Sequence, residues 1–525
     1  MLYEIECHDC HQSVVENIIM MLVLCFLALF SLAAANECIP RYFGDGSIVC
    51  VCNSTYCDST PETNVAPRSF LWYSSTKSGR RMDLTVGKMS NTSTSSRTIT
   101  IDHKLQYQEI KGFGGAFTDS AGINIRNLSE TTQENLFNTY FGEDGSRYNI
   151  GRVPIGGTDF STRFYTYDDI NKDTLLRNFS LASEDMDFKI PLMQRALRIN
   201  PEMQFLAAAW TAPAWMKTND YYTGFGFLKK EYYQVYTDYI LKFMDNYKKE
   251  GLEMWALSTG NEPSNAYYPI NRINAMGWTS SGLGNWVANN LGPSLANSQH
   301  NQTLIITVDD QRYALPWSVD LIFKNNLAEK YISGIGIHWY WDSLVPAKVL
   351  DITHNHFPDK FLLITESCEG SFPWQNPKVR LGNWDRAESY VTQIIENLQH
   401  WSTGWIDWNL ALDKTGGPTW INNNVDSPII VNPETDEFFK QPMYYALHHF
   451  SRFLPRGSVR IASKDSSIMF HPLLSVAFQT PKNETVVVIY NRSGSFKEVD
   501  LVDSKNGIIN LQLAPLSINT VVYSS

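Results

Sequence analysis

Charge is scarce in this chain, and its lysines and arginines form no basic block. Charged residues make up 18% of the 525 residues, and the formal net charge at pH 7 is -11. A nucleic-acid partner is therefore not expected, because such partners require a clustered positive surface. Long disordered stretches are not expected either, because charge is low and hydrophobic residues reach 43%. At about pH 5 the chain approaches neutrality, which would permit contact with an anionic membrane surface.

Long apolar runs are missing after the first 35 residues. Residues 18–35 are apolar except for Ser31 and end in three consecutive alanines before Asn36. This pattern predicts a secretory signal peptide over residues 1–35. A membrane anchor is the alternative, because the run is just long enough to span a bilayer. The preceding segment is acidic where a signal peptide is usually basic, so Met20 and Met21 are alternative start sites.

Cysteine is rare beyond residue 57, where Cys368 alone remains. Upstream, four cysteines form a tight, even-numbered cluster, which in a secreted chain predicts two disulfides. We expect the pairs Cys38–Cys50 and Cys52–Cys57. A metal site is the weaker alternative, because Cys52 and Cys57 lack a second ligand pair at zinc spacing. Cys368 is expected to be a small buried thiol, and no metal or other cofactor is expected.

Asn-X-Ser/Thr triplets also fit secretion, because they accept glycans in secreted proteins, although they arise by chance as well. The candidate glycosylation sites are Asn53, Asn91, Asn127, Asn178, Asn301, Asn483 and Asn491.

The rhythm of apolar residues predicts the fold class. Short β-type runs occur near both ends of the chain, and neither end has enough of them for a sandwich of its own, so we expect one shared β-sandwich. Between them, apolar strands alternate with amphipathic helices in eight units over about 340 residues, which predicts an α/β fold with a (β/α)8 TIM barrel. A doubly wound open sheet is the rival, but no Gly-rich phosphate loop follows the first strand.

Two of these apolar runs, residues 253–263 and 360–367, carry the glutamates Glu262 and Glu366 at the ends of the fourth and seventh predicted strands. In a barrel both side chains would face one mouth. A retaining glycosidase needs one protonated and one ionised carboxyl group about 5 to 5.5 Å apart. The alternative is that both are ordinary surface or salt-bridged residues. The 15 tryptophans suit sugar stacking, but they suit core filling equally well.

Several motifs occur in one order along the chain: the cysteine run 38–57, Arg152-Val153-Pro154, residues 210–215, Asn261-Glu262-Pro263-Ser264, residues 309–312, His338-Trp339-Tyr340, Glu366-Ser367-Cys368, and residues 404–412, 425–431 and 440–443. This set closely resembles glycoside hydrolase family 30, in particular its acid glucosylceramide-cleaving members, from Cys38 to the C-terminus. The resemblance implies that Glu262 is the acid/base and Glu366 the nucleophile. It also implies that Asn261 binds the sugar 2-hydroxyl, that Tyr340 lies beside the carboxylates, and that the glucose pocket is lined by Asp159, Trp210, Trp408 and Asn423.

The resemblance further implies three regions, whose expected bounds are 36–62 with 410–441 for a small disulfide-bearing β domain, 63–107 with 458–525 for the β-sandwich, and 108–409 with 442–457 for the barrel. It implies glucosylceramide at a membrane surface as substrate, a saposin-type activator and anionic lipids as partners, and the lysosomal lumen as location. The loop 265–278 departs from the family pattern, which puts aglycone preference in question. Its aromatics Tyr267, Tyr268 and Trp278 are candidate lipid contacts or packed side chains.

Two other functions remain open at this point. One is another family 30 activity, such as a β-xylosidase or β-1,6-glucanase, and the other is a catalytically silent glycolipid-binding relative. His338 is expected either to tune the two glutamates or only to complete buried hydrogen bonds.

Overall fold

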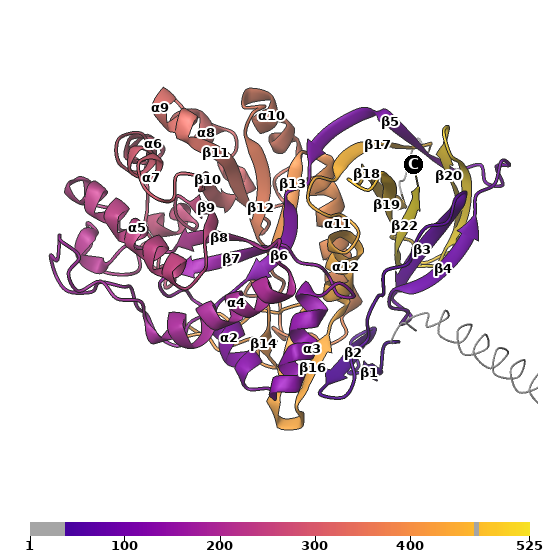
Figure 1. The fold of residues 1–525 in the computed structure, drawn as a ribbon, viewed down its shortest axis with the longest axis horizontal. Helices are drawn as coiled ribbons and strands as arrows, with labels where there is room; N and C mark the ends of the chain where they lie inside the picture. Colours follow the sequence, from indigo (N-terminus) through magenta and orange to yellow (C-terminus); the bar gives the residue numbers. More distant parts are fainter. Residues whose placement is uncertain (1–36, 467–471, 525) are drawn as a thin grey trace, which may run out of the picture.

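The computed structural model describes residues 37–466 and 472–524, so the predicted signal peptide of residues 1–35 lies outside the described part. Within it, the strands form a closed eight-stranded barrel, a nine-stranded sheet and a five-stranded sheet. Figure 1 shows the barrel and the nine-stranded sheet side by side, with helix α12 (Pro442–Ser451) between them. The predicted fold class, a TIM barrel with a β-sandwich and a disulfide-bearing β piece, is confirmed.

The barrel strands follow one another around the ring in chain order and pair in parallel. They are nearly continuous apolar runs, as expected for strands buried on both faces. One interior layer consists of Ile150, Leu206, Ala256, Ile306, Leu363 and Ile406. The strands are β6 (Gly112–Ala116), β7 (Ile150–Ile155), β8 (Gln204–Ala209), β9 (Met254–Ser258), β10 (Leu304–Gln311), β11 (Ile332–His338), β12 (Phe361–Glu366) and β13 (Ser402–Asn409).

The glycines of β6 serve close packing in the barrel wall. A Cβ added at Gly114 would lie 1.6 Å from the carbonyl oxygen of Ile150 on β7. On the other side, a Cβ at Gly404 of β13 would lie 2.0 Å from the carbonyl oxygen of Gly112. The glycine-rich start of the barrel is therefore a site of close backbone approach.

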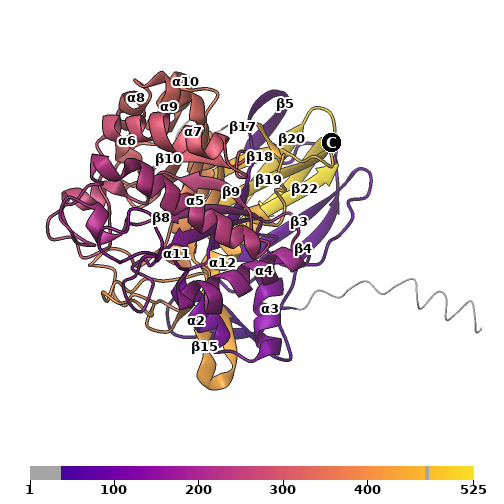
Figure 2. The ribbon, with the colours of Figure 1, turned by 60° about the vertical axis from the view of Figure 1, so that its left-hand side comes forward.

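Helices cover the outside of the barrel (Figure 2). Helix α11 shows why such segments are helical: Asn383 caps it by accepting from the Arg386 amide, and its buried residues Ala387, Tyr390, Val391, Ile394 and Leu398 recur every three or four positions. The other helices are α2 (Asp119–Arg126), α3 (Glu130–Phe141), α4 (Ile190–Ile199), α5 (Tyr233–Lys249), α6 (Ser280–Trp286), α7 (Gly292–Ala296), α8 (Trp317–Ile322), α9 (Asn326–Tyr331) and α10 (Lys348–His356), and α11 itself spans Trp384–Gln399. No helix in residues 37–466 and 472–524 combines the length and hydrophobicity needed to cross a bilayer.

The nine-stranded sheet joins both ends of the described chain. Three strands come from the N-terminal part and six from the C-terminal part, and β5 runs on toward the barrel strand β6. The order is β21-β20-β5-β17-β18-β19-β22-β3-β4. The strands are β3 (Ser69–Thr76), β4 (Asp83–Lys88), β5 (Thr98–Glu109), β17 (Val459–Asp465), β18 (Leu473–Gln479), β19 (Glu484–Asn491), β20 (Lys497–Asp503), β21 (Gly507–Leu513) and β22 (Ser517–Ser524).

One of the candidate glycosylation sites is corrected by this sheet. Asn491 ends β19 with its side chain fully buried, and its Nδ2 donates to the carbonyl oxygens of Ser495, Leu513 and Ala514 at 3.0, 3.3 and 2.7 Å. The amide nitrogen that would carry a glycan is therefore committed to the fold. The other six candidates stay predictions.

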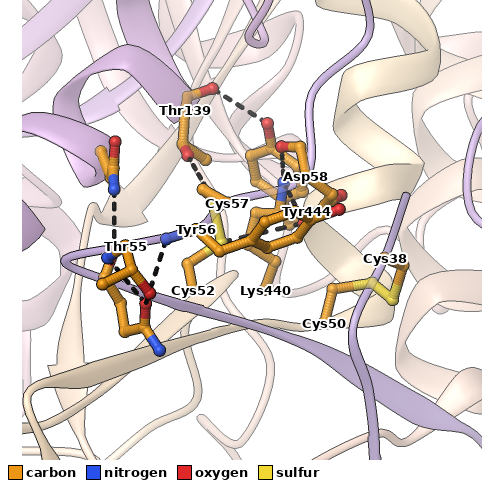
Figure 3. The surroundings of a disulfide bond; sticks show 12 residues. Cys38, Cys50, Cys52, Thr55, Tyr56, Cys57, Asp58, Thr139, Lys440 and Tyr444 are labelled. Carbon is orange, nitrogen blue, oxygen red and sulfur yellow. Dashed lines mark hydrogen bonds and ion pairs between the residues drawn. A yellow bond between two sulfur atoms is a disulfide. The ribbon is translucent and has the colours of Figure 1, made fainter. Parts of the chain in front are cut away.

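The small sheet holds the disulfides Cys38–Cys50 and Cys52–Cys57 (Figure 3). Its strands come from two distant segments, and the ion pair of Lys440 with Asp58 at 2.8 Å helps to join them. They are β1 (Pro40–Tyr42), β2 (Ile48–Asn53), β14 (Leu412–Asp413), β15 (Ile429–Asn432) and β16 (Glu437–Lys440). The loop between β14 and β15 extends to the mouth of the barrel and carries Asn423 there.

Candidate active site

A cavity of about 220 Å³ opens beyond the C-terminal ends of the barrel strands. Each residue that the sequence placed in a glucose pocket lines it. Six of the eight lie at or just beyond strands β8, β9, β11, β12 and β13, and the other two lie on the loops after β7 and β14. The structure therefore brings together Asp159, Trp210, Asn261, Glu262, Tyr340, Glu366, Trp408 and Asn423.

Glu366 is the last residue of β12, and its carboxylate accepts hydrogen bonds from two side chains. Arg152 of β7 donates from Nη1 to Oε2, and Tyr340 donates to Oε1 at 2.8 Å. His338 lies 3.7 Å from Oε1. Burial raises the pKa of Glu366 against the opposing charges of His338 and Arg152, and the nearby Glu262 adds to the increase. The cation and the phenol stabilise the ionised form that a nucleophile requires.

Glu262 follows β9 in a left-handed conformation, with φ 40°. Such a backbone is uncommon for a residue other than glycine and is typical of functional positions. Its carboxyl group has a hydrogen-bond partner on each oxygen: Gln311 and His338 meet Oε1 at 2.6 and 2.8 Å, and Asn265 meets Oε2 at 2.6 Å. The backbone turns the side chain into the cavity, and these partners fix its orientation.

His338 connects Glu262 to a buried carboxylate. Its Nδ1 faces Glu262 and its Nε2 lies 3.1 Å from Asp309 Oδ1. Burial alone would lower the pKa of His338, but the charge of Glu366 and the hydrogen bonds to Asp309 and Glu262 raise it to about 10. The ring is therefore an imidazolium at neutral and acidic pH, and both nitrogens donate.

The buried carboxylate of Asp309 contacts both cations of the site, Arg152 and His338. Burial opposes its ionisation, but the charge of Arg152 and the hydrogen bonds from His338 and Ser258 hold the pKa of Asp309 well below its usual range. Arg152 Nη2 donates to it at 2.8 Å and to Asn261 Oδ1 at 2.7 Å. Arg152 and His338 thus face three carboxyl groups, and the cluster is electroneutral when one of the three is protonated.

The opposite wall of the cavity combines two stacked tryptophans with a carboxyl–amide pair. Trp210 and Trp408 stack at 5.1 Å between ring centroids, and the guanidinium of Arg152 lies 4.9 Å from the Trp210 ring. Asn423 donates to Asp159 Oδ2 at 2.9 Å. Burial and the charge of Glu366 raise the pKa of Asp159 to about 7, against the hydrogen bond from Asn423. Stacked rings offer an apolar surface to a ligand, and the carboxyl and amide groups of the Asp159–Asn423 pair can form hydrogen bonds with ligand hydroxyl groups.

The two glutamates are close enough to act on one bond. Single carboxylate oxygens of Glu262 and Glu366 and one ring nitrogen of His338 all lie within 4.8 Å of one another, which fits the about 5 to 5.5 Å of a retaining pair better than the wider inverting arrangement. The same three side chains have the donor types of a metal site. Arg152 already supplies the positive charge at Glu366, so a second cation there would be repelled.

Four residues of this network were not assigned a role from the sequence: Arg152, Asn265, Asp309 and Gln311. Arg152 gave the clearest signal, because it is the one charged residue of the run Ile150–Ile155. A buried charge in a central strand demands partners. Of the two roles weighed for His338, the contacts support tuning, because the ring touches Glu262 directly.

Comparison with known proteins agrees with this geometry. The profile of the glycosyl hydrolase family 30 TIM-barrel domain matches residues 110–454, and that of the family 30 beta sandwich domain matches residues 457–521. The lysosomal acid glucosylceramidase of Mus musculus is 43% identical over 497 residues, covering 93% of this chain and 96% of the relative. Putative glucosylceramidase 3 of Caenorhabditis elegans is 42% identical, covering 95% and 98%. The crystal structure of SrfJ from Salmonella typhimurium superposes with a TM-score of 0.80 at 28% identity, covering 87% of this chain and all of that one.

Proposed function

Because the chain belongs to glycosyl hydrolase family 30, we propose that it hydrolyses the β-glucosidic bond of glucosylceramide and releases glucose and ceramide. As a member of this family it is a glycoside hydrolase. The lipid substrate is supported by two relatives named as glucosylceramidases at more than 40% identity over nearly the whole chain. The observation that carries the proposal is the convergence of Glu262 and Glu366 on one cavity at the barrel mouth.

The proposed mechanism is a double displacement. Glu366 attacks the anomeric carbon and forms a covalent glucosyl-enzyme, while protonated Glu262 donates its proton to the leaving oxygen. Water then attacks the same carbon, Glu262 takes the proton from it, and Glu366 leaves as a carboxylate. Two inversions retain the β configuration.

The charge network supports this sequence of steps. Before attack, one proton among the three carboxyl groups balances Arg152 and His338. When Glu366 becomes an ester its charge disappears, so the remaining charges balance once Glu262 has given up its proton. Each state of the cycle is thus electroneutral inside the cluster, which keeps the cost of moving charge in a buried site low.

A substrate with hydrocarbon chains requires contact with a lipid surface, and exposed apolar side chains occur on the loops that follow the barrel strands, at the end of the barrel where the cavity opens. They are Tyr221, Phe225, Tyr268, Ile270, Trp341 and Trp374, and Ile270 is 91% exposed. Trp278 is not among them: it is buried and stacks on Trp286 at 5.0 Å, so of its two expected roles the packed side chain is the one supported. We propose that this rim meets the membrane, and that a Tyr268→Ser variant binds glucosylceramide vesicles more weakly than the parent.

We also propose that a saposin-type activator and anionic lipids assist the reaction, and that it takes place in the lysosomal lumen, as the name of the mouse relative suggests. The expected bounds of the three regions stand as a proposal too. They are supported by the composition of the three sheets, each of which combines segments distant in the chain or closes on itself.

The decisive experiment is covalent trapping with a 2-fluoro-β-glucoside followed by peptide mapping. We expect the label on Glu366, no label in a Glu366→Gln variant, and slower trapping in Glu262→Gln because leaving-group protonation is lost. Label on another residue would overturn the assignment. Parallel assays with chromogenic β-glucosides and β-xylosides separate the proposed activity from a β-xylosidase, and absence of both trapping and turnover would indicate a silent relative.

A further inference from the structure

A long loop, residues 156–182, follows the barrel strand β7, and its backbone forms only turns and bends. Loops of this length are uncommon in a compact domain unless they are functional or disordered. This one is packed against the barrel: Tyr167 stacks on Tyr239 of α5 at 5.9 Å between ring centroids, and the Lys242 ammonium donates to the Leu176 carbonyl at 3.0 Å. The middle of the loop therefore has a fixed place in the fold.

Residues 168–173 in the middle of this loop are rich in side-chain oxygens. Asp169, Asn171 and Asp173 have the spacing of the first half of a calcium-binding EF-hand loop. The second half of that pattern is missing, because no glycine follows Asp173 and Ser180 stands where an EF-hand has its glutamate. The spacing alone therefore does not establish a binding site.

The independent observation is Asp168, which precedes this pattern. Asp168 is only 2% exposed, yet neither of its carboxylate oxygens meets a donor at good hydrogen-bond geometry among the described residues. The Trp215 indole donates to its backbone carbonyl at 2.9 Å, which fixes its position. Its charged neighbours are the carboxylates of Asp173 and Asp169. A buried carboxylate that faces other carboxylates requires a positively charged partner or a proton.

Asp173 faces Asp168 and is held as an anion. Asn178 donates to Asp173 Oδ2 from its backbone and its side chain at 2.8 Å each, and these bonds keep the pKa of Asp173 below its usual range. The carboxyl groups of Asp168 and Asp173 are close enough to share a proton, and burial together with this neighbour raises the pKa of Asp168 to about 6. Two carboxylates at this distance repel each other unless a proton or a metal cation lies between them.

The ligand types favour calcium over other cations. Residues 162–180 contain no cysteine or histidine, which are the ligands that zinc and copper prefer. Magnesium demands a near-ideal octahedron, whereas calcium accepts six to eight oxygens in a flexible arrangement that includes backbone carbonyl groups and water. Asn171 is exposed and offers a third side-chain oxygen on the same turn.

We propose that Asp168 and Asp173 bind a calcium ion, with Asn171, backbone carbonyl groups and water as the remaining ligands. The ion stabilises the loop and does not take part in the proposed reaction, because none of these residues lines the candidate active-site cavity. The dissociation constant is expected at about 10⁻⁴ to 10⁻³ M, as in the calcium sites of extracellular modules.

The first test uses terbium, a trivalent ion that occupies calcium sites and emits light when a nearby tryptophan is excited. Trp215 contacts Asp168 directly, so tryptophan excitation of the full chain should produce terbium emission. Calcium should displace the terbium, and magnesium should require an at least about tenfold higher concentration. Asp168→Asn should lose this emission. Asp220→Asn should keep it and is the matched control, because Asp220 already pairs with Lys229 at 2.7 Å.

Thermal unfolding at pH 7 distinguishes a calcium ion from a proton between the two carboxyl groups. In a chelator, Asp168→Asn removes the repulsion and its amide can donate to Asp173, so its Tm should equal or exceed that of the parent. Calcium at about 10 mM should raise the Tm of the parent and of Asp220→Asn by about 1 to 4 °C and should not change that of Asp168→Asn. Asp173→Asn, on the less buried side of the pair, should lose the same response.

Two results would overturn the proposal. If neither terbium emission nor the Tm of the parent responded to calcium, the two carboxyl groups would share a proton only. If Asp168→Asn and Asp173→Asn responded as the parent does, calcium would bind elsewhere on the chain. Neither measurement uses turnover, so failure of the proposed glucosylceramide hydrolysis would leave both results unaffected.

Discussion

Two regions of the molecule bury histidines completely, and they leave them in opposite charge states. His338 lies in the candidate active site between Glu262 and Asp309, and its pKa is raised to about 10. His449 lies on α12, where the barrel meets the sandwich, and its nitrogens bond the hydroxyls of Thr520 and Ser75 at 2.8 and 2.9 Å. Burial and the charge of Arg81 lower the pKa of His449 to about 3.

The comparison shows that burial alone does not decide the charge of a side chain. Desolvation disfavours the imidazolium in both places, and the carboxylates around His338 reverse its effect. The neighbouring His448 follows the pattern of His449, because burial and the charge of Arg452 hold its pKa well below the usual range. At the site carboxylates face the histidine, whereas at the interface the direct partners of His449 are neutral hydroxyls and the nearby charges are cations.

The largest effect is expected when a cation is removed from each region. Arg152→Met leaves Asp309 and Glu366 buried without their counter-charge, which should cost about 3 to 5 kcal/mol of unfolding free energy and at least about 10³-fold in kcat/KM. Arg81 is similarly buried but donates to neutral acceptors, namely the carbonyl groups of Thr76, Arg80 and Ile48 and the Ser47 hydroxyl. Arg81→Met should keep the specific activity of the folded enzyme.

Thermal unfolding and turnover of both variants check this prediction. Equal loss of activity per folded molecule in Arg81→Met and Arg152→Met would show that the cation at the site has no special role. An Arg152→Lys variant should recover part of the stability, because one charge returns, but little of the activity, because the two-armed contact to Glu366 and Asp309 does not.

The next effect separates charge from hydrogen bonding at His338. Glutamine can keep hydrogen bonds to Glu262 and Asp309 but carries no charge, so His338→Gln should lower kcat/KM by about 10²-fold. Loss of the positive charge also raises the pKa of Glu366 further. The acidic limb of the pH–rate profile should therefore move to higher pH.

The counterpart at the interface is His449→Gln, which should leave the pH–rate profile in place. If the pH–rate profile of His338→Gln decreased in height but did not shift along the pH axis, His338 would not tune the pKa values of the two glutamates and would have a purely structural role.

A smaller effect concerns stability in acid. The pKa of His449 in the folded state lies below its value of about 6.5 in the unfolded state. Below about pH 6.5 the unfolded state therefore binds more protons than the folded state, and the free energy of unfolding decreases as the pH is lowered. At pH 5 this cost is about 2 kcal/mol for His449. His338 has the opposite sign: its contribution is complete below about 6.5 and is lost as pH rises through about 10.

Denaturant unfolding at pH 7 and pH 5 measures the difference. His449→Gln should be less stable than the parent at pH 7 but should lose about 2 kcal/mol less on acidification. An identical pH dependence in parent and variant would mean that the pKa of His449 is the same in the folded and the unfolded state.

The fold and the two glutamates were predictable for a common reason. A buried parallel strand is a short apolar run with a polar end, and Phe361–Glu366 has that form whatever its neighbours are. Repetition of such runs determines the barrel, and the barrel brings Glu262 and Glu366 to one mouth. The glucose-pocket residues followed from the family resemblance, and the structure places them in one cavity.

The electrostatic network was not predictable in the same way. Arg152 stands out in an apolar strand, but its partners Asn261, Asp309 and Glu366 are 109, 157 and 214 residues away. Which acceptor such a residue finds depends on strand register and on the tilt of the barrel. Trp278 shows the same limit, because the loop sequence leaves exposure and packing open and only the contact with Trp286 on α6 shows that the ring is buried.

The smallest expected effect removes one hydroxyl from each region. Tyr340 donates to Glu366 at 2.8 Å, and Tyr444 on α12 donates to the Thr139 carbonyl at 2.9 Å. A hydrogen bond to a charged group is worth about 1.5 to 3 kcal/mol and a neutral one about 1 kcal/mol. Tyr340→Phe should therefore lower kcat at least about tenfold and lower Tm as well, whereas Tyr444→Phe should lower Tm with little change in kcat. If both variants affected only Tm, the phenol of Tyr340 would belong to the packing of the barrel mouth and the contrast between the two regions would rest on their charged groups alone.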